Sequence, residues 1–113
     1  MFRGEIWELS LPKSKRSRAA QTRRVVLLSS DSLGILPLRV VIPLVPWNDT
    51  YASVPWMVRI PPTLHSGLDS VMAADALQVR SVLSQHLLRR VGELPRPLVD
   101  AIASAVAVVL EGG

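Results

Sequence analysis

Positive charge is concentrated near the start of this chain, in a short run that no folded core can contain. Six of the 13 lysine and arginine residues fall between residues 12 and 25, and no acidic residue lies between Glu8 and Asp31. Burying several unpaired charges costs more than a small domain gains on folding. The run must therefore lie in solvent or meet an anionic partner. It consists of Lys13, Lys15, Arg16, Arg18, Arg23 and Arg24.

Composition narrows the class of protein. The 113 residues are sufficient for one domain over 1–113, and 49% hydrophobic residues are too many for a disordered chain. The net charge of +4 and the pI of about 10.7 favour polyanionic partners. The absence of cysteine excludes disulfides and thiolate metal sites. Because the sequence has neither a signal peptide nor a membrane-length apolar stretch, we expect a cytoplasmic protein that does not contact membranes.

Short strands dominate the predicted structure. Residues 6–11 alternate apolar and polar side chains, and residues 25–28 form an apolar β-branched run, so a basic loop is expected over 12–24. Pro43 predicts that one further strand lies at a sheet edge or ends irregularly. Other strands are expected over 38–44, 51–60, 70–79 and 89–94, and one or two helical turns over 81–88.

The C-terminal segment predicts a helix over about 96–110. Pro95 and Pro97 suit its first turn, and apolar residues then recur at helical spacing from Leu98 to Val109. Apolar residues cover so much of its surface that we expect it to lie between a sheet and a second subunit. Several short antiparallel strands closed by one helix predict an α+β, mainly β fold of the small-barrel type.

Five segments, in their order and spacing, resemble the MazF/PemK/Kid family of toxins from type II toxin–antitoxin pairs. They are RGEIW at 3–7, RRVVLLSSD at 23–31, VVIPLV at 40–45, SGLDSVMAAD at 66–75 and LLRRVGEL at 87–94. The resemblance implies an SH3-like barrel with a C-terminal helix, the architecture that CcdB and PemK share. It also implies a homodimer, and a cognate acidic antitoxin as partner.

The same resemblance implies sequence-selective cleavage of single-stranded RNA, including mRNA, without a metal or other cofactor. In that chemistry the ribose 2′-OH attacks its own phosphate, which requires proton transfer and a cation to stabilise the phosphorane. Arg23 matches the family's arginine at the start of the second strand. Asp75 matches the acid of its DQxRT motif, and either acts as base or orients the arginine.

Several positions depart from the family pattern. Arg24 stands where a proline is usual, and Val45 replaces a threonine that contacts the reacting phosphate, although valine cannot donate a hydrogen bond. Ala76 and Gln78 replace the glutamine and second arginine of DQxRT. A non-catalytic family member that only binds RNA therefore stays an alternative, as does a CcdB-like topoisomerase poison.

Candidate RNA-binding residues extend beyond the catalytic pair. The cations Lys13, Lys15, Arg16, Arg18 and Arg24 suit phosphates, and Gln21 partly replaces a polar group of the family's first loop. Trp47 is placed at a strand end where its ring can stack on a base, whereas Trp7 in the alternating first strand suits the core. Histidine is the side chain suited to proton transfer near neutral pH, so His65 and His86 are candidates for proton relay, and His65, just before a turn, is the better one.

Overall fold

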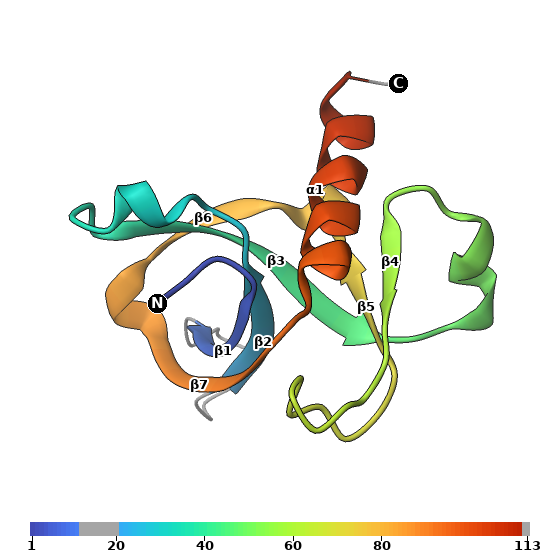
Figure 1. Cartoon of the computed structure of the whole chain (residues 1–113), viewed down its shortest axis with the longest axis horizontal. Coiled ribbons are helices and arrows are strands. Elements are labelled where there is room, and N and C mark those ends of the chain that lie inside the picture. Colours follow the sequence, from blue (N-terminus) through green and yellow to red (C-terminus); the bar gives the residue numbers. More distant parts are fainter. Residues whose placement is uncertain (12–20, 112–113) are drawn as a thin grey trace.

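The computed structural model describes residues 1–11 and 21–111, which form a mainly β domain with one C-terminal helix (Figure 1). The strands are β1 (Glu5–Leu11), β2 (Gln21–Leu27), β3 (Leu38–Pro46), β4 (Met57–Ile60), β5 (Met72–Asp75), β6 (Arg80–Leu83) and β7 (Leu87–Glu93). The 3-10 turns are η1 (Asp31–Leu33), η2 (Asp49–Ser53), η3 (Ala76–Gln78) and η4 (Ser84–His86), and the helix is α1 (Arg96–Glu111). The predicted fold class is confirmed. No helix in this part of the chain is long and apolar enough to cross a membrane.

The strands form one antiparallel sheet that curls on itself. Its order is β4-β5-β3-β2-β1-β7, and β6 pairs with β3 beside β5. In Figure 1, β7 sweeps round beneath β1 and β2, so that these strands, β3 and β6 enclose a small barrel-like space. Strands β4 and β5 with η2 form an arm on the other side of α1.

Strand β2 starts four residues earlier than the apolar run at 25–28 predicted. Its ladder with β1 extends to the rung Leu11↔Gln21 and includes Leu9↔Arg23 and Glu8↔Arg24. The loop predicted over 12–24 is therefore shorter, because Arg23 and Arg24 belong to the strand. At the rim of a curled sheet their backbones pair while their side chains still reach solvent. Residues 12–20, including Lys13, Lys15, Arg16 and Arg18, lie outside the described residues.

Of the two alternatives predicted for Pro43, the sheet edge is wrong, because β3 has neighbours on both sides. The irregular end is confirmed, because Val25↔Pro43 is the last rung of the β2–β3 ladder. One side pairs with β2, through the rung Val25↔Pro43 among others. The other side pairs with β6 from Leu38 to Val41 and with β5 from Leu44 to Pro46. Pro43 falls in the gap between these two ladders, so its missing N–H removes no rung from either. The proline thus marks the point where β3 exchanges partners.

Two hydrophobic cores lie on opposite faces of the β1–β2–β3 sheet. Ile6, Val26 and Ile42 belong to the core that α1 covers, together with Leu44, Ile60, Leu68, Ala74, Leu94, Val99 and Ile102. The second core fills the inside of the curl and consists of Leu9, Val25, Leu27, Val41, Val82 and Leu87. The half-buried Trp7 packs against this second core, as predicted from the alternation of β1. A central sheet buried on both faces accounts for its long apolar runs.

Three other predicted elements differ from the structure. Strand forms only at the end of 51–60, because the side chain of Asn48 accepts a hydrogen bond from the Thr50 N–H and starts η2. The segment 70–79 breaks after Asp75, and 81–88 is the strand β6 followed by η4 rather than helix. The helix is confirmed at Arg96–Glu111, with Val99, Ile102 and Ala105 buried. The C-terminal end of α1 is not covered by the rest of the domain, since Leu110 is 72% exposed.

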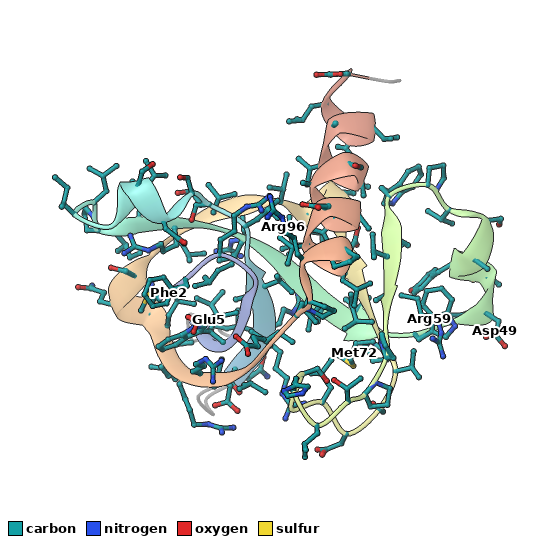
Figure 2. All side chains as sticks on the ribbon, in the orientation of Figure 1. Phe2, Glu5, Asp49, Arg59, Met72 and Arg96 are labelled. Atoms are coloured by element: carbon teal, nitrogen blue, oxygen red, sulfur yellow. The ribbon has the colours of Figure 1, made fainter. Side chains whose placement is uncertain are left out.

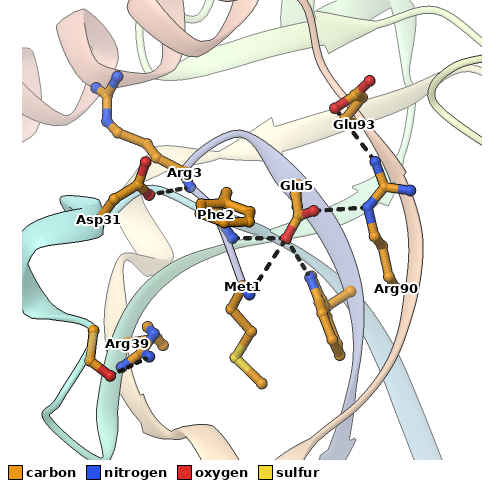
Figure 3. A network of polar contacts seen from close by, with 10 residues as sticks. Met1, Phe2, Arg3, Glu5, Asp31, Arg39, Arg90 and Glu93 are labelled. Carbon is orange, nitrogen blue, oxygen red and sulfur yellow. Dashed lines mark hydrogen bonds and ion pairs between the residues drawn. The ribbon is translucent and has the colours of Figure 1, made fainter.

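A buried carboxylate ties the chain's start to β7 (Figure 3). Glu5 accepts hydrogen bonds from the Phe2 N–H at 2.7 Å, the Trp7 indole N–H at 3.2 Å and Arg90 Nε at 2.7 Å. Burial alone would raise the pKa of Glu5, but these hydrogen bonds outweigh it and lower the pKa below the usual value. Arg90 also pairs with Glu93 at 3.3 Å. The network fixes the register in which β1 enters the barrel.

Candidate active site at the rim of the barrel

Arg23 and Arg24 leave β2 on opposite faces. Arg23 pairs with Leu9 and is two residues from Val25, and both of these belong to the core inside the curl. Arg24 pairs with Glu8 on the other face, and its charge helps Arg89 to lower the pKa of Glu8. The main cause of that shift is the hydrogen bond from Arg89 to Glu8, 2.7 Å long. Because side chains alternate along a strand, Arg23 lies at the mouth of the barrel and Arg24 lies on the other face, beside Glu8 and Arg89.

Asp75 is a nearly buried carboxylate, 7% exposed, at the end of β5. Its Oδ1 accepts a hydrogen bond from the Leu77 N–H at 3.1 Å and so begins the turn η3. Its Oδ2 accepts one from Gln78 Nε2 at 2.8 Å. Both oxygens are thus held by N–H donors, and the carboxylate has a fixed orientation.

Gln78 joins the two residues that the sequence singled out. While its Nε2 donates to Asp75, its Oε1 accepts a hydrogen bond from Arg23 NH1 at 3.4 Å. Arg23 and Asp75 are therefore brought together through an amide rather than in a direct ion pair. In the sequence Gln78 is visible only as a departure from the family's DQxRT motif. Its position three residues after an acid that begins a turn was the signal that could have revealed its role.

Val45 lies on the same face as this group. It pairs with Ala73, two residues before Asp75, and is two residues after Pro43, the partner of Val25. The β2–β3 ladder ends at the rung Val25↔Pro43, two residues before Val45 and two after Arg23. The position that the family pattern fills with threonine thus shares a strand face with Arg23, but its side chain here offers no hydrogen bond. Ala76, the other departure, is fully buried and donates its N–H to the Trp56 carbonyl.

A cavity of about 380 Å³ opens at the same end of β1. Its walls include Leu9, the register partner of Arg23, and its polar groups are Ser10, Ser81, Arg80 and His86. Arg80 follows Gln78 by two residues and was not predicted as a binding residue. The sequence feature that could have indicated Arg80 is its position directly after the segment that matches the family's DQxRT motif. Apolar walls with one guanidinium, one imidazole and two hydroxyl groups suit a nucleotide in size and chemistry.

Two other predicted binding residues lie away from this group. Trp47 donates its indole N–H to Asp49 at 3.0 Å and packs edge-on against Tyr51, with ring centroids 5.8 Å apart. Figure 2 places Asp49 on the outer side of the arm. His65 lines a separate cavity of about 400 Å³ beside Leu98. The His65 carbonyl accepts a hydrogen bond from the Glu93 N–H. Glu93 pairs with Glu5, at the end of β1 that is far from Arg23.

Gln21, the first residue of β2, pairs with Leu11 where the described part of β1 ends. It therefore stands directly after the basic segment 12–20, two residues from Arg23. Within residues 1–11 and 21–111, no three His, Asp or Glu side chains converge in a way that could hold a metal ion.

The family model described as "PemK-like, MazF-like toxin of type II toxin-antitoxin system" matches residues 2–110. The chain belongs to this toxin family. Endoribonuclease MazF9 of Mycobacterium tuberculosis is 35% identical over 115 residues, which cover 98% of this chain and 97% of the relative. Arg23, Asp75 and Val45 all lie within the part of the chain that matches the PemK/MazF toxin family.

Solved structures of the family have the same fold. A MazE–MazF crystal structure from Deinococcus radiodurans superposes with a TM-score of 0.78 at 17% identity, covering 100% of this toxin and 97% of that chain. An endoribonuclease in complex with its cognate antitoxin, from a mycobacterial species, gives 0.76 at 16% identity, covering 98% and 95%. The SH3-like barrel with a C-terminal helix is therefore confirmed for this PemK/MazF toxin.

Proposed function

We propose that this toxin is a metal-independent endoribonuclease that cuts single-stranded RNA at the mouth of its barrel. The observation that carries the proposal is the Arg23 guanidinium, held by Gln78 in front of the buried Asp75 carboxylate. The relative MazF9, which aligns along nearly the whole chain, is named an endoribonuclease. A guanidinium at a rim open to solvent is the kind of group that a developing phosphorane requires.

The proposed reaction is an internal transesterification. The 2′-oxygen forms a bond to the adjacent phosphorus, and the bond from phosphorus to the 5′-oxygen of the next nucleotide breaks. Solvent water takes up the proton of the 2′-OH and supplies one to the leaving 5′-oxygen, so the proton count is unchanged. The products are a 2′,3′-cyclic phosphate and a 5′-hydroxyl. Arg23 stabilises the negative charge on the non-bridging oxygens during this step. Asp75, whose two oxygens already accept hydrogen bonds, acts as an orienting group.

Two sets of cations support RNA binding near Arg23. The cavity lined by Arg80 and His86 is of a size for one nucleotide. In the sequence, the basic residues of 12–20 directly precede β2, and their cations are proposed to contact phosphates.

We also infer two protein partners. The net charge of +4 suits an acidic antitoxin, and two solved structures of similar fold are complexes with an antitoxin or with MazE. A second copy of the chain would cover apolar surface that a monomer leaves in water, including Leu110 on α1.

The deciding experiment is an RNA cleavage assay in EDTA. The purified protein is incubated with a set of single-stranded RNAs, and the new ends are identified by their chemistry. We expect 2′,3′-cyclic phosphate ends, and a loss of about 100-fold or more in kcat for Arg23→Ala. Arg24→Ala serves as the matched control, with an effect confined to KM. Binding without cleavage would support the non-catalytic alternative, which the apolar Val45 favours. No effect on RNA at all would overturn the proposal.

A further inference from the structure

We propose that Gln78 is a positioning residue that aligns Arg23 for attack on the RNA phosphate, and that it replaces the direct carboxylate–guanidinium contact of an ordinary pair. The inference rests on the proposed function and adds a residue that the family pattern does not contain. The Gln78 side chain contacts both residues: its Oε1 accepts a hydrogen bond from Arg23 NH1, and its Nε2 donates one to Asp75 Oδ2.

The chemistry of the amide makes this arrangement directional. A glutamine offers a carbonyl that only accepts and an NH₂ that only donates. Arg23 can only donate and the Asp75 carboxylate can only accept, so one orientation of the Gln78 amide satisfies both. Asp75 is in turn held by the Leu77 N–H, which ties the whole chain of contacts to the backbone of η3.

The arrangement also explains how Arg23 remains available to a phosphate. A bidentate ion pair with Asp75 would occupy the guanidinium fork and cancel its charge. The amide instead takes one N–H of Arg23 and carries no charge, which leaves the other donors and the full positive charge for the substrate. The contact between Arg23 NH1 and Gln78 is long, at 3.4 Å, in keeping with an arginine that tightens onto its site when RNA is bound.

Three variants test the role. Gln78→Met keeps the length of the side chain and removes both hydrogen bonds. Gln78→Glu keeps the shape, and when protonated its carboxyl presents an acceptor to Arg23 and a donor to Asp75, as the amide does. When ionised it repels Asp75 instead. Gln85→Met, at an exposed glutamine of η4, is the matched control.

For Gln78→Met we expect kcat to fall about tenfold to a hundredfold at every pH, with KM within about twofold, because a misdirected cation fails in the transition state. For Gln78→Glu the activity relative to wild type should be lower at pH 8 than near pH 5, since protonation restores an acceptor toward Arg23 and a donor toward Asp75. The Asp75 carboxylate favours that proton and the Arg23 cation opposes it. Gln85→Met should match the wild type.

The outcomes separate this inference from the proposed function. If the wild type cuts RNA and Gln78→Met is equally active, or if the ratio of Gln78→Glu to wild type does not change with pH, the positioning role is wrong and the function stands. If the wild type leaves RNA uncut, both are overturned. Amide ¹⁵N spectra monitor the contacts themselves: the Gln78 side-chain signal should shift in Arg23→Lys and in Asp75→Asn, and stay in place in Arg24→Lys.

Discussion

Arg23 and Arg24 are neighbours in β2, yet Arg23 hydrogen-bonds Gln78 at the mouth of the barrel while Arg24 lies across from Glu8 on the other face. We therefore expect lysine substitutions to have unequal effects. Arg23→Lys keeps the charge but loses the planar fork, and should lower kcat about tenfold. Arg24→Lys should leave kcat within about twofold. Steady-state cleavage of one RNA by both variants checks this, and equal losses would contradict the assignment of faces.

Val45→Thr should raise activity. The new hydroxyl would lie on the face that Arg23 and Asp75 share, at the position where the family pattern has threonine. One additional hydrogen bond to a charged phosphate is worth about 1.5–3 kcal/mol, or at least about tenfold in kcat. Thermal unfolding should show a free energy of unfolding lower by about 1 kcal/mol, because the new hydroxyl is half-buried. Val54→Thr, at the end of η2, is the control, and a gain in that variant as well would argue against a local effect.

Gly92→Ala should be strongly destabilising. A Cβ at residue 92 would lie 2.2 Å from the Ser66 carbonyl oxygen and 2.4 Å from the His65 carbonyl oxygen, and both oxygens belong to the backbone. Gly67, opposite, has φ +69° and a Cβ there would meet the Val91 oxygen at 2.2 Å. We expect each alanine variant to lose about 2–4 kcal/mol in urea unfolding. Gly34→Ala, where the nearest atom is 3.4 Å away, should change stability by less than about 0.5 kcal/mol.

Glu5→Gln should make stability less dependent on pH. The pKa of Glu5 is lowered in the folded state, so its contribution is complete above the unfolded value of 4.5 and disappears as pH falls through the lower folded pKa. At pH 7 we expect the variant to be about 2 kcal/mol less stable, because Arg90 loses its buried partner. The difference should shrink below pH 4. Glu93→Gln, at an exposed residue, should show no such trend.

Serine at positions 13, 15, 16 and 18 should weaken RNA binding without affecting kcat. Each phosphate contact that is lost should reduce the slope of log affinity against log salt by about 0.7. A slope unchanged from the wild type would mean that these cations only keep the protein soluble. The measurement uses a 2′-O-methyl RNA, which binds but has no nucleophile.

Much of this protein could be predicted from its amino-acid order. Alternation and β-branched runs located β1, β3 and the apolar half of β2, proline and helical spacing located α1, and the order of five short segments indicated the family. Arg23 and Asp75 could be proposed as site residues because the motifs that carry them are local. Predictions were poorest where a short apolar segment could adopt either structure, as at 81–88, since the pairing of β6 with β3 decides its conformation.

What the sequence by itself determined was the run of cations that must lie outside any core, and the short strands and helix beside it. Only the tertiary structure decided which arginine faces the barrel, where β3 exchanges partners at Pro43, and that Gln78 connects Arg23 to Asp75. The reason is physical. Arg23 and Gln78 are 55 residues apart, so their hydrogen bond depends on three strands meeting in one register. A shift of one residue in β2 would turn Arg23 away and bring Arg24 to the barrel instead.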